Sequence, residues 1–220
     1  MNREIFEFLY DLEKNNNREW FAQNKARYEE IKKTLERFVT KLILNINSFD
    51  SSIDIKDASK TFFRIYRDTR FSTNKDPYKT NFGSIIVPER YRRLCEYPAY
   101  YLHLQNESSF VSMGVYMPDA QVLKHIRHAI DEDFDTFAKI VRKLDNSFGG
   151  LLRESDSLKR VPQGFDRNSP AAEYLKLKHF YVFKEFSNEE VLREDFLERI
   201  ISLYRDSYEL KKWFAENVKS

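Results

Sequence analysis

The chain has 220 residues, of which 41% are hydrophobic and 15% are aromatic, and it contains only 5 Gly and 6 Pro. This composition excludes a disordered or low-complexity chain, and we expect a single domain over residues 1–220. The 37 Lys and Arg residues nearly balance the 35 Asp and Glu residues, so the net charge of +2 excludes a protein that recruits nucleic acid through its overall field.

The N-terminal region has the sequence period of helices. Apolar positions in residues 5–12 predict a short helix, and the three asparagines at residues 15–17 end it and offer a cap for the next one. From residue 18 to residue 46, apolar side chains recur at intervals of three and four. This spacing predicts one long helix with a buried face.

Short segments rich in aromatic and β-branched side chains follow. Four of them, divided by turn-forming sequence, cover residues 60–67, 82–87, 98–104 and 109–116. Spacings of about ten residues suit hairpins and leave no room for crossover helices, so we expect antiparallel strands. Residues 180–183 are a candidate fifth strand.

Helical patterns return after Pro118 and again from Asn188 to about Val218, where we expect a long C-terminal helix. The order of elements is therefore helices, then strands, then helices. This order predicts an α+β fold, with a mainly antiparallel sheet of four to five strands, helices packed on one side of it, and long N-terminal and C-terminal helices.

No feature of the sequence indicates export or a membrane. The single Cys95 cannot form an intrachain disulfide, and the start, MNREIFEFLYDLEKNN, interrupts its apolar positions with charges, unlike a signal peptide. The sequence lacks a run of roughly 18 apolar residues that could span a bilayer. We expect a cytoplasmic protein with no membrane partner.

The densest basic cluster lies in residues 60–81, which contain six basic residues and only two acidic ones, Asp68 and Asp76. Arg side chains offer paired donors that match phosphate or carboxylate oxygens, and neighbouring Tyr and Phe rings offer stacking faces. We therefore predict an anion site with these ligand-binding residues: Arg64, Arg67, Arg70, Lys75, Tyr78 and Lys79. The alternative is that the cations pair with carboxylates and that the aromatic rings belong to the core.

Four long motifs together resemble a known family. They are NNNREWFAQNKARYE, FFRIYRDTRFSTNKDPYKTNFG, GVYMPDAQVLKHIRHAI and LKRVPQGFDRNSPAAEYLKLKHFYV. In this order and spacing they resemble domain-of-unknown-function family 2461, a family of conserved hypothetical proteins. The resemblance covers essentially the whole chain and implies a single unit, but it carries no assigned activity or catalytic residues.

Motifs for common chemistries are absent from the sequence. There is no GxGxxG or Walker-type loop, no GxSxG, no HExxH and no EF-hand pattern. His125 and His128 are one helical turn apart without a close third ligand, so we predict no metal site. His103 occupies a polar position of its strand, where it could serve as an acid or base or as a hydrogen-bonded structural residue. Catalytic residues and any cofactor stay unassigned.

Three functions fit these observations. The leading hypothesis is a domain that binds a phosphorylated small molecule or a nucleotide at the basic cluster. The first alternative is a nucleic-acid-binding module, in which Lys and Arg contact the backbone and aromatic rings stack on bases. The second is a protein-interaction domain, without catalysis, that docks an acidic segment.

Overall fold

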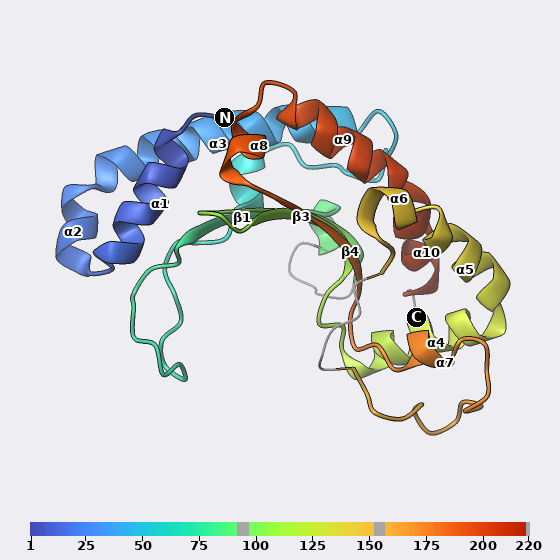
Figure 1. The fold of residues 1–220 in the computed structure, drawn as a ribbon. Coiled ribbons are helices and arrows are strands. Elements are labelled where there is room, and N and C mark those ends of the chain that lie inside the picture. The colour runs from blue at the N-terminus through green and yellow to red at the C-terminus, as the bar shows by residue number, and fades with distance from the viewer. Residues whose placement is uncertain (92–96, 152–156, 219–220) are drawn as a thin grey trace. The chain divides into compact units, whose positions relative to one another are not determined.

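The computed structural model describes residues 1–91, 97–151 and 157–218 (Figure 1), and Cys95 lies outside these residues. The helices are α1 (Glu4–Lys14), α2 (Arg18–Gln23), α3 (Lys25–Ile46), α4 (Ala120–Glu132), α5 (Phe134–Arg142), α6 (Asp145–Phe148), α7 (Ala172–Leu175), α8 (Asn188–Leu192), α9 (Phe196–Asp206) and α10 (Tyr208–Asn217). The strands are β1 (Asn81–Ile86), β2 (Ala99–Gln105), β3 (Ser109–Val115) and β4 (Phe180–Phe186).

The four strands form one antiparallel sheet in the order β1-β2-β3-β4, which confirms the predicted α+β class. Side chains alternate along β2: Tyr100, Leu102 and Leu104 are buried, and the residues between them are half-buried. One face of this strand therefore belongs to the core, and its other face carries polar groups that remain partly accessible.

The predicted strand at residues 60–67 is wrong. A short 3-10 helix, η1 (Ala58–Thr61), replaces its beginning, and the rest makes only isolated bridges, Phe62 with Ser84 and Tyr66 with Tyr78. The segment leaves β1 early because residues 65–67 pair with residues of their own loop. The fourth strand of the sheet is instead β4, the candidate fifth strand of the sequence analysis.

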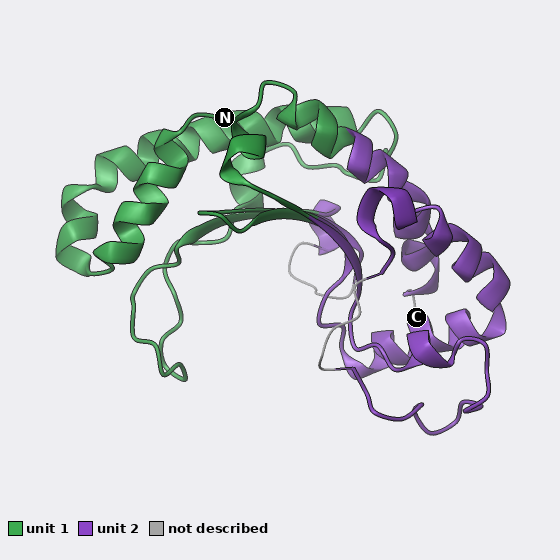
Figure 2. Cartoon of the chain, in the orientation of Figure 1, with its two compact units in different colours: residues 1–86, 101–111, 185–201 green, residues 87–100, 112–184, 202–220 purple. Residues whose placement is uncertain are grey.

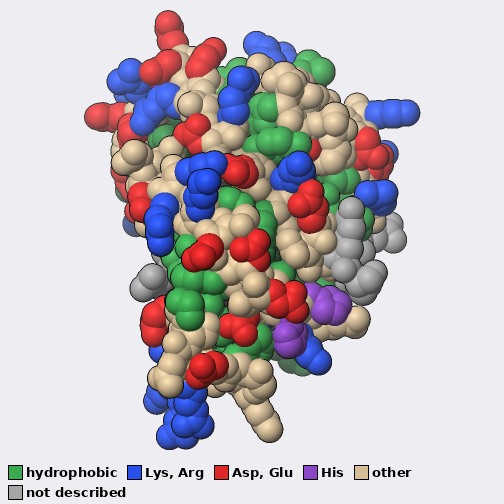
Figure 3. All heavy atoms as spheres, turned by 90° about the vertical axis from the view of Figure 1, so that its right-hand side faces the viewer, with side chains coloured by type: hydrophobic (Ala, Val, Ile, Leu, Met, Phe, Trp, Pro, Cys, Tyr) green, Lys and Arg blue, Asp and Glu red, His purple; other side chains and the backbone are tan. Residues whose placement is uncertain are grey.

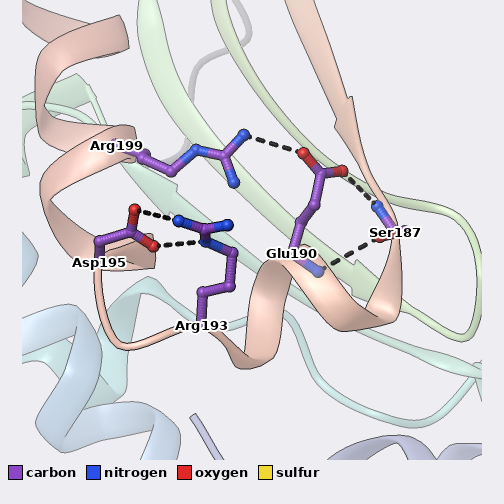
Figure 4. Close-up of polar contacts among 5 residues, drawn as sticks. All are labelled: Ser187, Glu190, Arg193, Asp195 and Arg199. Carbon is purple, nitrogen blue, oxygen red and sulfur yellow. Dashed lines mark hydrogen bonds and ion pairs between the residues drawn. The ribbon is translucent and has the colours of Figure 1, made fainter.

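Two predicted long helices are interrupted. At Asn24 the backbone leaves the helical region (φ −101°, ψ 9°), and its side chain donates to the Trp20 carbonyl at 2.9 Å, so residues 18–46 form α2 and α3. The predicted helix from Asn188 divides into α8, α9 and α10. Its cap is Ser187, whose hydroxyl accepts from the Glu190 N–H in a capping box (Figure 4).

The chain forms two compact units (Figure 2). Unit 1 comprises residues 1–86, 101–111 and 185–201, and unit 2 comprises residues 87–100, 112–184 and 202–220. Unit 1 buries one side of α1 and α3, and unit 2 has an aromatic core in which Phe214 contacts Phe137 and Phe180. The single domain expected from the sequence stays a prediction.

The surface charge is mixed. On the face drawn in Figure 3, acidic and basic side chains are interspersed over most of the surface, in keeping with the nearly balanced composition. Among the described residues, no helix combines the length and apolar character that a membrane span requires.

Candidate anion-binding site

The basic cluster lies on a long loop of unit 1, residues 62–80, which extends from the start of β1 (Figure 1). The loop begins against β1, where the Phe63 N–H donates to the Gly83 carbonyl at 2.9 Å. It then folds back on itself: the Lys79 N–H donates to the Ile65 carbonyl at 2.8 Å, and the Arg67 N–H donates to the Pro77 carbonyl at 2.9 Å. The two arms of the loop are therefore held together by main-chain hydrogen bonds.

Polar side chains shape the tip of this loop. The Asp68 carboxylate accepts from the Arg70 N–H at 3.2 Å, and the Asn74 side chain accepts from the Asp76 N–H at 2.8 Å. Such bonds to a residue two positions ahead are typical of Asx turns, and Pro77 favours a turn as well. The polar sequence between the two arms thus explains the turns locally.

Asn16 and Tyr78 anchor the base of the loop. The Asn16 side chain donates to the Tyr78 carbonyl at 3.0 Å and accepts from the Tyr78 N–H at 3.1 Å. The Tyr78 ring is buried and stacks on Phe21 of α2, with centroids 4.0 Å apart. Tyr78, predicted as a ligand-binding residue, is thus placed by the structure where it holds the loop.

Three of the predicted cations have partners inside the loop. Arg70 donates to both carboxylate oxygens of Asp68, at 3.0 and 2.6 Å, and its hydrogen bonds lower the pKa of Asp68. Arg67 lies 4.0 Å from Asp76, and Lys75 donates to a main-chain carbonyl at 3.0 Å. Arg67 and Arg70 thus have a carboxylate partner, Lys75 has a main-chain partner, and the assignment of these three residues to ligand binding stays a prediction.

Arg64 and Lys79 differ from those three cations. Within the described part of the chain, neither side chain lies within hydrogen-bonding or ion-pair distance of a carboxylate. The Lys79 ammonium lies 5.3 Å from the centroid of the Phe63 ring, and its pKa is lowered by burial and then by the positive charge of Arg64. Arg64 also contributes, as a smaller cause, to the lowered pKa of Asp68. Two like charges therefore act on each other without a bonded counter-charge.

Exposed aromatic rings accompany these two cations. Ile65 is buried, whereas Phe63, two positions before it, is 50% exposed. The Tyr66 ring is 54% exposed and packs against Tyr78 at 5.3 Å. Each ring leaves a face on which a planar group could stack.

A row of polar side chains on β2 continues from Phe63. The Phe63 ring meets the edge of Tyr101 at 6.1 Å. The Tyr101 hydroxyl lies 3.0 Å from His103 Nδ1, and His103 Nε2 lies 3.0 Å from the Gln105 amide oxygen. Because that oxygen accepts, the ring proton resides on Nε2, and the Tyr101 hydroxyl donates to Nδ1.

His103 is held as a neutral imidazole in this row. Burial lowers its pKa, and the hydrogen bond to Gln105 opposes that shift as a smaller effect. Phe110 stacks on the ring at 4.6 Å with an interplanar angle of 15°. The alternation of the strand sequence places His103 on one face with Tyr101 and Gln105, but it does not predict the hydrogen bonds that join the three side chains.

The family model described as a conserved hypothetical protein (DUF2461) matches residues 4–213. The chain belongs to this family. No curated protein and no solved structure matches it. The family assignment confirms the resemblance found in the four motifs. For function, it shows a domain of unknown function and nothing more specific.

The other candidate groups of this DUF2461 chain are the possible metal ligands, His125 and His128 among them. Among the described residues, no three His, Cys, Asp or Glu side chains gather as a metal site would require. The ring of His128 lies 4.9 Å from that of Phe165, and Nδ1 of His125 is buried without a hydrogen-bond partner in the described structure.

Proposed function

We propose that this chain is a cytoplasmic ligand-binding domain that holds a phosphorylated small molecule or a nucleotide at Arg64 and Lys79 of the 62–80 loop. The observation that carries this proposal is the absence of a bonded carboxylate at these two side chains within the described residues. A partly buried ammonium next to a second cation is destabilised, and an anion would relieve both the desolvation and the repulsion.

The aromatic rings favour a ligand that also carries a planar group. Phe63 and Tyr66 flank Arg64 and Ile65 in the sequence, Phe63 lies 5.3 Å from the Lys79 ammonium, and both rings keep about half of their surfaces exposed. Stacking on such rings contributes about 1–3 kcal/mol per base. A nucleotide therefore uses both features of the site, whereas a sugar phosphate uses only the cations.

Thermal denaturation with added ligand tests this proposal. We expect uridine monophosphate to raise the midpoint of the wild type, because a ligand at a hundredfold excess over its Kd adds about 2.7 kcal/mol. Arg64→Ala and Lys79→Ala should fold normally and lose the shift. Arg70→Ala is the matched control and should keep it, since Arg70 is engaged by Asp68. A shift that survives in both Arg64→Ala and Lys79→Ala would refute the assignment of the site.

Single-stranded nucleic acid is the second candidate, and the tip of the loop favours it. Phe71 is 95% exposed and lies 5.8 Å from the guanidinium of Arg70, which gives a further stacking face next to a cation. Binding to a strand should weaken steeply with salt and strengthen with length, because phosphate contacts release counterions. Affinity for a short oligonucleotide that is insensitive to salt would exclude this candidate.

A further inference from the structure

Unit 1 contains a second feature that the anion-binding loop does not use, a cleft of about 360 Å³ along the second half of α3. It is lined by Met1, Thr34, Arg37, Phe38, Lys41, Arg193, Glu194, Phe196 and Leu197. The volume lies at the lower end of the range of small-molecule sites, about 300–1,000 Å³. It therefore suits a compact ligand.

Aromatic rings form the apolar part of the cleft. Phe38 of α3 and Phe196 of α9 stack with centroids 6.0 Å apart and an interplanar angle of 20°. Phe186 packs edge-on against Phe196, with ring centroids 5.2 Å apart. Phe196 is almost completely buried and supports Phe38 from the core, whereas Phe38 and Leu197 are half-buried and keep an accessible apolar surface in the cleft.

Two cations on α3 stand beside the aromatic wall. Arg37 and Lys41 are four residues apart, so they share one side of the helix, and like charges at this spacing repel. Among the described residues neither has a carboxylate within ion-pair distance. The Arg37 guanidinium donates to the Thr34 hydroxyl at 3.1 Å, which orients it.

The lining residues 193–197 add little negative charge to balance Arg37 and Lys41. Arg193 donates to both oxygens of Asp195, at 2.8 and 2.9 Å, so this pair is internally neutral (Figure 4). Glu190 is engaged by Arg199 at 2.8 Å in the same view. Glu194 is the acidic residue of the lining, so the cleft keeps an excess of positive charge.

We propose that this cleft binds a small amphipathic anion: a carboxylate or phosphate group at Arg37 and Lys41, with an aromatic or branched apolar body against Phe38 and Leu197. The cations alone are exposed and would hold a free ion weakly, because water screens exposed charges. The apolar side chains alone do not fix the orientation of a ligand. A ligand that carries both an anionic group and an apolar body can contact the cations and the apolar side chains at the same time.

Calorimetric titration of the full chain with four probes tests the requirement for both parts. Phenyl phosphate and phenylacetate carry an anion and a ring, inorganic phosphate carries only the anion, and benzyl alcohol carries only the ring. We expect at least one of the first two probes to bind roughly tenfold or more tightly than either single-part probe. Equal binding of all four probes, or no binding of any probe at millimolar concentration, would overturn the proposal.

Variants locate the binding and separate it from the loop site. Lys41→Ala and Arg37→Gln should each weaken the tighter probe by roughly tenfold. Lys25→Ala removes an exposed charge from the start of the same helix and should leave the affinity unchanged. Arg64→Ala should also leave it unchanged. If Arg64→Ala abolishes binding while Lys41→Ala does not, the probe occupies the 62–80 loop and the cleft assignment is wrong.

Discussion

The two units place their unusual cations in opposite environments. In unit 1, Arg64 is exposed and Lys79 is half-buried, with its ammonium over the Phe63 ring. In unit 2, Lys211 is 2% exposed and lies over the rings of Tyr97 and Tyr100, at 5.4 and 5.6 Å, and Arg127 is 9% exposed. A cation enclosed by rings stabilises the fold, whereas a cation that reaches solvent without a carboxylate is available to a ligand.

Substitution of Lys211 should lower the free energy of unfolding more than any other proposed change. A small loss would contradict the comparison between the two units. Lys211→Ala removes a buried stem that packs on two rings and leaves a cavity, so we expect the free energy of unfolding to fall by about 2–4 kcal/mol. Urea denaturation measures the loss. The control is Lys212→Ala, an exposed neighbour 3.9 Å from Glu216, which should cost about 0.5 kcal/mol or less. Equal losses in the two variants would show that burial does not distinguish them.

Two glycines sharpen the comparison further. A Cβ at Gly114, where φ is +148°, would lie 2.2 Å from the Phe180 carbonyl oxygen in unit 2. A Cβ at Gly83 in unit 1 would lie 2.5 Å from the Tyr101 hydroxyl, the end of a side chain that can rotate away. We expect Gly114→Ala to destabilise the protein by on the order of 2 kcal/mol or more, and Gly83→Ala by about 1 kcal/mol or less.

Thermal and urea denaturation of both glycine variants give the ranking. A second readout belongs to Gly83→Ala alone: the NMR signals of His103 should shift, because the displaced Tyr101 hydroxyl no longer donates to its ring. A larger loss of stability in Gly83→Ala than in Gly114→Ala would contradict the packing described for the two strands.

The fold was predictable wherever the local pattern and the tertiary structure agree. Alternation of apolar residues located β1, β2 and β3, and the asparagines at 15–17 marked the first helix end. The strand at 60–67 failed because its sequence has β propensity, but only residues 62 and 63 pair with β1, while residues 65–67 form hydrogen bonds within their own loop, whose base Asn16 anchors. The break at Asn24 was hidden because apolar spacing continues across it.

The sequence predicted where the candidate site lies, but not which of its cations have carboxylate partners. Sequence alone found the basic cluster, since charge density needs no tertiary information. It could not separate Arg70, whose partner Asp68 is two residues away, from Arg64, which lacks a bonded carboxylate within the described structure. Pairing depends on loop geometry. The cleft at Arg37 and Lys41 was missed altogether, because its walls come from segments about 150 residues apart.

Loosening the base of the loop should give an intermediate effect. Asn16→Ala removes two hydrogen bonds to the main chain of Tyr78, and we expect a loss of about 1–2 kcal/mol together with faster amide exchange in residues 62–80. Asn15→Ala is the matched control, because the Asn15 side chain, at the end of α1, donates to the Asp11 carbonyl of that helix at 2.9 Å. Exchange that is unchanged in Asn16→Ala would mean that Asn16 does not anchor the loop.

The smallest expected effect is a dependence of stability on pH through His103. Burial lowers the pKa of this imidazole in the folded state, and the hydrogen bond to Gln105 opposes that shift only in part; its contacts Tyr101, Gln105 and Phe110 are uncharged near neutral pH. The unfolded chain takes up a proton as the pH falls below about 6.5, whereas the folded chain resists it. Because the unfolded state then binds more protons, stability falls as the pH falls through this window.

Urea midpoints measured from pH 7.5 downward, for the wild type and for His103→Gln, isolate this contribution. We expect the wild type to lose stability more steeply than the variant below about pH 6.5, since Gln does not titrate. Parallel curves would show that His103 is protonated equally in both states, and the row from Tyr101 to Gln105 would then not hold a neutral imidazole. A steeper wild-type curve would support that neutral state, which the hydrogen bond from the Tyr101 hydroxyl to Nδ1 requires.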